Sequence, residues 1–268
     1  MSLSPRSKGE LSLMRKSGEI TAKALKAVLK AVKAGITLIE LDKIAEAEIK
    51  KNGAQPGFMT VPGYKWATCV TINHEVVHGI PRDIKLAKGD LFSVDVGALL
   101  NGWHTDAAWS VIVGYESGVK DQEKTDPSTS SQDDFSAKNR FLKAGEEAMW
   151  QGINQARSGN RIGDIGASMQ KVVEGAGYSV VRSLVGHGIG KKLHEDPEVP
   201  GFGKAGKGLP LKKDMTIAIE AIYNQGGPDV VLDKDGWTIS SVDGSLGGLF
   251  EQTVAVAKNG PIVLTPYL

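Results

Sequence analysis

Residues 92–109 read FSVDVGALLNGWHTDAAW, and this stretch decides the fold. The alternation of polar and apolar residues predicts a strand on each side of Asn101-Gly102, which is a strong two-residue hairpin turn. If that turn sets the register, Asp106 lies on the same face as Asp95, at the diagonal position. Two carboxylates that face an apolar sheet need a cation, because unpaired buried charges are costly. Taken alone, the pair could equally be one aspartate near a turn and one hydrogen-bonded core aspartate.

A helix pair precedes this hairpin. Apolar residues recur at three- and four-residue steps from about Gly9 to Ala34, which is typical of an amphipathic helix. After a helix stop at Gly35, Thr37 and Glu40 form a capping box that opens a second helix, which runs to Gly53.

The same pattern recurs in the second half of the chain. A helix is expected from about 137 to 159, and a further one to Gly175 and Gly177. Three residue pairs share one offset of 124 (159 − 35, 177 − 53 and 164 − 40): Gly35 and Gly159, Gly53 and Gly177, Glu40 and Asp164. Two copies are too few for a solenoid. We therefore expect a single α+β domain over residues 1–268, with pseudo-symmetric halves at about 10–114 and 136–268.

Strands are expected to follow each helix pair. The ranges are 67–73, 91–98 and 103–113 in the first half, and 179–184, 215–223, 230–242 and 249–257 in the second. Residues 116–134 (ESGVKDQEKTDPSTSSQDD) are polar, acidic and poor in aromatic residues, so they predict a mobile surface excursion with no part in the chemistry.

Composition limits the function classes. The net charge of +1 gives no electrostatic footprint for nucleic acid, and no apolar run approaches the ~20 residues that span a bilayer. Cys69 is the only cysteine, and the amino terminus lacks the apolar segment of a signal peptide. These features predict a cytoplasmic protein with no nucleic-acid or membrane partner.

Four further polar residues stand in unusual surroundings. His187 lies between glycines in GHGIG, and His194 follows seven residues later. Glu220 is surrounded by apolar residues in MTIAIEAIY, and Glu251 repeats this pattern in LGGLFEQTVAV. A lone histidine is more often structural, and each glutamate alone could belong to an edge strand or to an ion pair between strands.

Together the segments supply an oxygen-rich ligand set with one nitrogen: Asp95, Asp106, Glu220, Glu251 and His187. Such a set suits Mn²⁺, Fe²⁺, Co²⁺ or catalytic Zn²⁺ better than a closed structural zinc site. Four carboxylates and one histidine can hold two ions ~3.5–4 Å apart, an arrangement that favours hydrolysis.

Five motifs then carry a family resemblance: NHEVVHGIP, DVG with HTDAAW (whose aspartate follows that of DVG by eleven residues), GHGIG with HEDP, AIEAI and FEQT. From Lys16 onward the chain resembles the type I methionine aminopeptidases of the M24 metallopeptidases. The resemblance implies the pita-bread fold, in which two pseudo-symmetric halves form a curved antiparallel sheet covered by helices. The internal repeat agrees with it independently.

The resemblance also implies roles for ten residues. The ligands of two divalent ions (Co, Mn, Fe or Zn) would be Asp95, Asp106, His187, Glu220 and Glu251, with Asp106 and Glu251 bridging. His78 would contact the substrate, His194 would stabilise the oxyanion, and Glu220 would shuttle the proton of a metal-bridging hydroxide. The methionine pocket would be lined by Tyr64, Cys69 and Trp237, whose chemistry suits a thioether. The implied activity removes the initiator methionine from nascent polypeptides with a small second residue. A monomer is expected, and a ribosome contact stays open.

Three alternatives remain. Aminopeptidase P and prolidase share the ligands but carry an extra amino-terminal domain, whereas this catalytic fold begins near the first residue. Type II methionine aminopeptidases insert a subdomain between the ligands corresponding to His187 and Glu220, which here are 33 residues apart (220 − 187). A non-catalytic binding module would have lost ligands, and all five are present. Two departures from the family concern substrate tuning and loop behaviour: Ala221 replaces the usual proline after the glutamate, and the acidic excursion is long.

Overall fold

The computed structural model describes residues 5–115 and 129–266, with side chains in the second range from residue 133 onward. The helices are α1 (Lys8–Ala31), α2 (Leu38–Lys51), α3 (Thr129–Asn154) and α4 (Ile162–Gly175). The strands are β1 (Gln55–Pro56), β2 (Thr68–Ile72), β3 (Glu75–Val77), β4 (Leu91–Leu100), β5 (Trp103–Ile112), β6 (Ser179–Val180), β7 (Gly186–Gly188), β8 (Glu195–Val199), β9 (Thr216–Asn224), β10 (Val230–Leu232), β11 (Ile239–Ser241), β12 (Gly247–Ala255) and β13 (Ile262–Val263). No helix among the described residues is long and apolar enough to cross a membrane.

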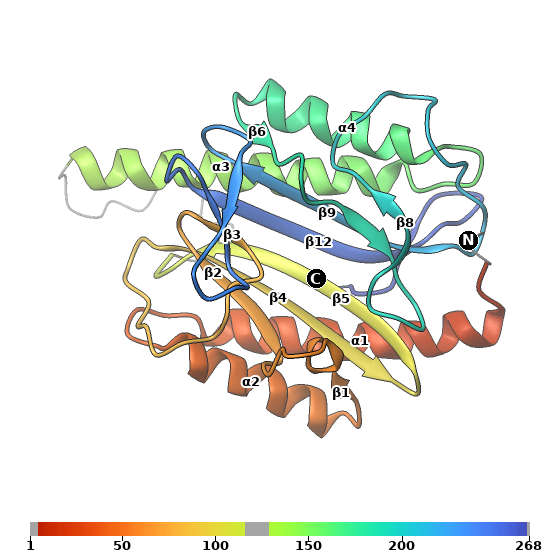
Figure 1. The fold of residues 1–268 in the computed structure, drawn as a ribbon, viewed down its shortest axis with the longest axis horizontal. Coiled ribbons are helices and arrows are strands. Elements are labelled where there is room, and N and C mark those ends of the chain that lie inside the picture. The colour runs from red at the N-terminus through yellow and green to blue at the C-terminus, as the bar shows by residue number, and fades with distance from the viewer. Residues whose placement is uncertain (1–4, 116–128, 267–268) are drawn as a thin grey trace.

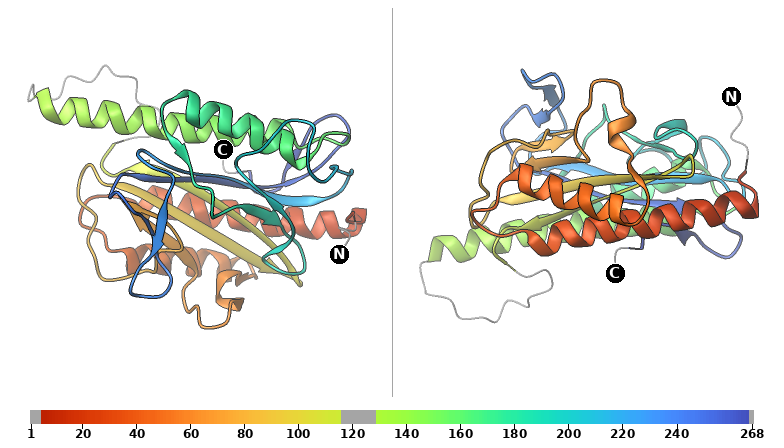
Figure 2. Two further views of the ribbon diagram at one scale, coloured as in Figure 1. Left: turned by 45° about the horizontal axis from the view of Figure 1, so that its top comes forward. Right: turned by 90° about the horizontal axis from the view of Figure 1, so that it is seen from below.

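The main sheet is antiparallel and joins both halves of the chain. Its central order is β1-β4-β5-β12-β9-β7-β8, so the first half meets the second where β5 lies beside β12. Figure 1 shows the strands running between two helix pairs, α1 with α2 on one side and α3 with α4 on the other. This arrangement confirms the expected α+β fold of two halves. A smaller sheet, β10-β11-β3, projects from it (Figure 2).

The hairpin register is as predicted. Asp95 pairs with Ala108, and Leu100 pairs with Trp103. The turn residue Asn101 has φ 49° and Gly102 has φ 79°, which is the left-handed backbone that a two-residue turn between twisted strands requires.

The internal repeat is confirmed in the backbone. Helices α2 and α4 each have 14 residues, and their first residues differ by the same 124 positions (162 − 38). Both begin with a carboxylate that accepts the backbone N–H three residues earlier: Glu40 from Thr37 and Asp164 from Arg161. The four glycines of the repeat all have positive φ: Gly35, Gly53, Gly159 and Gly177.

Several predicted boundaries are wrong. The helix expected to end at 159 ends at Asn154, and the strand expected at 179–184 ends at Val180. Helix α3 begins at Thr129, eight residues before the expected start (137 − 129), and its early turns are anchored by Phe135, which stacks on Tyr115 with ring centres 4.2 Å apart. Residues 116–128 of the predicted excursion lie outside the described residues. The single strand expected at 230–242 is instead two strands, because Asp235 accepts the N–H of Thr238 and Gly236 has φ 77°, which together make a turn.

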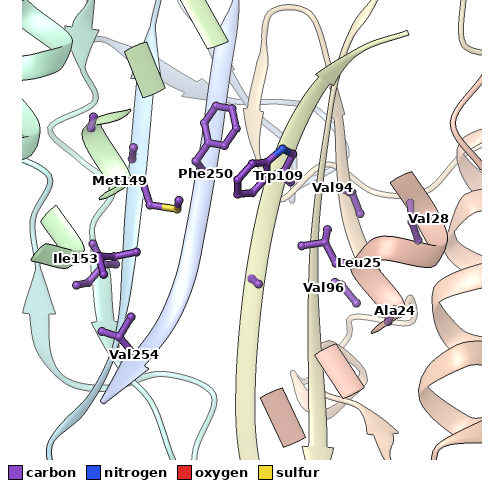
Figure 3. Close-up of a cluster of buried hydrophobic side chains, with 14 of the residues drawn as sticks. Ala24, Leu25, Val28, Val94, Val96, Trp109, Met149, Ile153, Phe250 and Val254 are labelled. Atoms are coloured by element: carbon purple, nitrogen blue, oxygen red, sulfur yellow. The ribbon is translucent and has the colours of Figure 1, made fainter. Parts of the chain in front are cut away.

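One face of the sheet carries the core. Val94 and Val96 of β4 point toward α1, whereas Phe250 and Val254 of β12 point toward α3 (Figure 3). Trp109 of β5 lies between the two groups, with its ring 5.1 Å from that of Phe250. Successive side chains of a strand point to opposite faces of the sheet. The residues that face away from the helices are therefore the odd-numbered ones on β4 and β12 and the even-numbered ones on β5 and β9. That opposite face carries the polar residues.

Candidate metal centre

Four carboxylates meet on the face opposite the helices. Glu251 pairs with Ala108 across the join between the halves and with Glu220 on the other side. Ala108 in turn pairs with Asp95, and Asp106 lies two residues from it on the same face. The register alone therefore gathers carboxylates from both halves of the chain.

His187 of β7 completes the cluster. The ligand atoms of Asp106, His187 and Glu251 lie within 4.8 Å of one another. His187 Nε2 is 3.6 Å from Asp106 Oδ2 and 3.8 Å from Glu220 Oε1. Asp95 lines the same cavity as these four residues. All five sequence-predicted ligands thus lie at one site.

The tautomer of His187 follows from its backbone neighbour. Its Nδ1 lies 2.9 Å from the carbonyl oxygen of Gly188, and a carbonyl oxygen only accepts. The hydrogen is therefore on Nδ1, and the lone pair of Nε2 faces the carboxylates. This is the usual orientation of a metal-binding histidine.

The electrostatics of the cluster fit cations. Burial, with Asp106 and Glu220 nearby, raises the pKa of Asp95 well above its ordinary value. Burial raises the pKa of Glu220 to about 7, and burial with the neighbouring carboxylates raises that of Glu251. Among the described residues, Asp95 Oδ1 and Glu251 Oε1 are buried without a hydrogen-bond partner. Acceptors of this kind are satisfied by divalent ions, so the residues present fit the metals that the sequence implied.

Thr253 orients Asp106, a role that was not predicted from the sequence. Its hydroxyl lies 3.0 Å from Asp106 Oδ1 and 2.8 Å from the Asp106 carbonyl oxygen, and it accepts the Asp106 N–H. The signal was present, because Thr253 stands two residues after Glu251 in FEQT and so shares its strand face.

Two further histidines line the cavity. His78 follows β3 with φ 58°, and burial beside His194 and His187 lowers its pKa to about 4. The rings of His187 and His194 are 4.5 Å apart and nearly perpendicular, and burial lowers the pKa of His194 as well. Both His78 and His194 are therefore uncharged near neutral pH.

The predicted pocket residues line the same cavity, which encloses about 910 Å³. The Tyr64 ring packs edge-on against Trp237 at 5.0 Å, and its hydroxyl donates to the Thr68 carbonyl at 2.7 Å. Burial raises the pKa of the Cys69 thiol, which stays protonated and apolar in character. Phe58 extends this wall. Nothing in its local sequence pointed to that position.

The comparisons with known proteins agree with this geometry. The model of metallopeptidase family M24 matches residues 12–258. The chain is 42% identical to a methionine aminopeptidase of Clostridium perfringens, with 97% of each chain covered, and 40% identical to methionine aminopeptidase 1 of Bacillus subtilis, with 96% of each covered.

Solved structures give the same result. The crystal structure of methionine aminopeptidase from Thermotoga maritima superposes with a TM-score of 0.87 at 37% identity, covering 98% of this chain and 99% of that one. A prolidase from Pyrococcus furiosus shares the fold alone, with a TM-score of 0.72 at 23% identity over 97% of this chain and 65% of that one. With its paired halves and its carboxylate and histidine cluster on the open face of the sheet, the chain belongs to metallopeptidase family M24.

Proposed function

We propose that this chain is a methionyl aminopeptidase that hydrolyses the amino-terminal methionine from nascent polypeptides whose second residue is small. The proposal rests on one observation: the carboxylate and histidine cluster and the predicted methionine pocket line the same cavity. A cluster of four carboxylates and His187 forms one part of its wall, and the aromatic group around Tyr64 and Trp237 forms another. A hydrolytic centre and an apolar slot for one side chain are what this reaction requires.

The proposed ligands are Asp95, Asp106, His187, Glu220 and Glu251, which have enough donor atoms for two divalent ions. Asp106 and Glu251 are proposed to bridge the ions, because both are nearly fully buried and face each other across the join of the halves. When bound, such ions polarise the scissile carbonyl and lower the pKa of a hydrolytic water. Whether the ions are Co, Mn, Fe or Zn is part of the experiment below.

The chain's own residues supply proton handling and orientation. Glu220, whose pKa burial raises to about 7, is suited to accept and return a proton near neutral pH. The uncharged His78 and His194 can each donate a ring N–H to the substrate amide. We assign His194 to the oxygen that gains charge and His78 to the scissile amide.

The specificity follows from the pocket wall. Tyr64, Cys69 and Trp237 offer aromatic rings and a thiol to a thioether side chain. A charged first residue would bury its charge against that wall without a partner. A large second residue would crowd the metal centre, so glycine, alanine and serine are expected there.

The test compares kcat/KM for peptides that begin Met-Ala, Met-Lys, Lys-Ala and Ala-Pro. The metal-free enzyme is assayed first and then after restoring one metal at a time. We expect Met-Ala to be preferred over Met-Lys, because a large second residue would crowd the metal centre. Lys-Ala should be refused, because the lysine charge has no partner in the pocket. A misfit of one methylene alone already costs ~1–3 kcal/mol. Equal cleavage of Lys-Ala would refute the pocket assignment. If Ala-Pro were cleaved best, a prolidase-like activity would replace the proposal, a candidate favoured by the shared fold.

We further propose that residues 1–268 form a single domain that acts in the cytoplasm as a monomer. The continuous sheet across the two halves and the single buried Cys69 support this proposal. Size-exclusion chromatography with light scattering tests the monomer, and fractionation of cells tests the location.

A further inference from the structure

Arg6 is a partly buried cation outside every motif that pointed to the function. It precedes α1, and only 12% of its side chain is exposed. Its guanidinium donates to Thr216 Oγ1 at 3.1 Å, to the Ile189 carbonyl at 3.2 Å, and to the Glu195 carboxylate in an ion pair. One side chain therefore ties the stretch from Ile189 to Glu195 to the start of β9.

Each of those segments leads to the metal centre. Ile189 follows His187 by two residues, Thr216 begins β9 four residues before Glu220, and Glu195 is the residue after His194. The guanidinium also lies over the ring of Trp103, the first residue of β5, at 5.3 Å.

The loop between β7 and β8 is shaped around this guanidinium. A side-chain carbon at Gly190 would overlap it, so only glycine admits Arg6 there. The Gly190 carbonyl accepts the His104 N–H at 2.7 Å, which fixes the loop to β5. The second oxygen of Glu195 accepts the Lys192 N–H at 2.9 Å. Glu195 is thus held at both oxygens, and His194 is the residue immediately before it.

We infer that Arg6 is a positioning residue: through Glu195 and the Ile189 carbonyl it holds residues 189–195 in place and so aims His194 into the cavity. The inference rests on the proposed role of His194 in the peptidase. Its physical basis is that a planar guanidinium can bond several acceptors at fixed angles. Without it, the partly buried Glu195 carboxylate would lose its charged partner, and the loop would lose its fixed geometry.

A loosened His194 should affect turnover more than binding. Misplacing a reacting group by about 1 Å costs on the order of 10²-fold in rate. The proposed methionine pocket is built on other segments, around Tyr64 and Trp237. Arg6 lines the same cavity, but its side-chain hydrogen bonds within the described residues go to Thr216, Ile189 and Glu195. Loss of Arg6 should therefore lower kcat by about 10- to 100-fold while KM changes little.

The first test measures kcat and KM of the metal-loaded enzyme on Met-Ala-Ser for Arg6→Met, Arg6→Lys and the parent, each also combined with His194→Ala. Arg6→Lys keeps the positive charge but loses the planar guanidinium with its several donors. We expect its kcat to lie between that of Arg6→Met and that of the parent. In the His194→Ala background, Arg6→Met should cost less than about twofold, because its effect passes through the missing ring. Losses that multiply in the double variant would overturn the inference, as would a change confined to KM.

The second test needs no activity. Hydrogen exchange of the amides in residues 189–195 should be at least about tenfold faster in Arg6→Met than in the parent. Arg161→Met is the matched control. Arg161 is an exposed arginine directly before α4, and its guanidinium donates to the Gly208 carbonyl. This variant should leave that exchange and kcat unchanged. Unaltered exchange in Arg6→Met would refute the inference, whereas an inactive parent with the expected exchange result would refute only the proposed peptidase.

Discussion

Replacing Glu220 with glutamine should stabilise the protein when metal is absent. In the folded state burial raises the pKa of Glu220 from 4.5 to about 7. A carboxyl whose pKa is higher in the folded than in the unfolded state lowers the free energy of unfolding at high pH. This destabilisation is absent below pH 4.5, grows between pH 4.5 and about 7, and is complete above pH 7. At about 1.4 kcal/mol for each pH unit between them, the loss is about 3 kcal/mol. Glu220→Gln removes it, and for a protein of this size the melting temperature should rise by about 6–12 °C at pH 8.

The assay is thermal unfolding of chelator-treated parent and variant from pH 4 to pH 9. The difference between them should vanish at pH 4 and reach its maximum above pH 7. Added Mn²⁺ or Co²⁺ should then favour the parent, since only its complete ligand set binds the ions well. Glu19→Gln, on the exposed side of α1, is the control for the loss of one carboxyl group. If Glu220→Gln were less stable than the parent at pH 8 without metal, the buried charge of Glu220 would not destabilise the metal-free protein. The reasoning that a bound ion offsets this charge would then be refuted.

Three further outcomes are expected. Asp106→Asn and Glu251→Gln should each lower kcat by more than about 100-fold with an unchanged circular dichroism spectrum, and near-normal turnover in either would contradict the two-ion site. Gly18→Ala should destabilise by about 1–3 kcal/mol in chemical denaturation, because its new methyl group would overlap a backbone carbonyl of the C-terminal segment. Gly9→Ala meets no neighbour and should instead stabilise α1. Burial raises the pKa of Glu195, but its hydrogen bonds outweigh burial and hold the pKa below 4.5. Metal-free Glu195→Gln should therefore be less stable than the parent, by the full amount above pH 4.5 and by less as the pH falls below it. A loss of stability that did not depend on pH would contradict this.

The sequence predicted most reliably what depends on local pattern. The Asn101-Gly102 turn specified the register of β4 and β5, and this register placed Asp95 and Asp106 on one face before any long-range contact was known. The repeated glycines Gly35 and Gly159 likewise marked the same bend in each half, because both need a positive φ.

What the sequence did not predict depends on segments that meet only after folding. Arg6 and Glu195 are 189 residues apart, and neither stands in a pattern that pairs them. Phe58 reaches the cavity wall from a short turn with no periodicity. The early start of α3 was missed because its first turns are polar, and the contact that anchors it, Phe135 on Tyr115, bridges two segments that are separate in sequence.

The join between the halves has a consequence for how such a protein could arise. Only two residue pairs link β5 to β12 along the backbone, and the proposed ligands are divided across that join: Asp95 and Asp106 on one side, His187, Glu220 and Glu251 on the other. Two aspartates alone are too few donors to hold a pair of divalent ions. A half-length ancestor could therefore have gained this chemistry only by assembling with a second copy of itself. Fusion of the two genes would then have freed each half to specialise its share of the ligands.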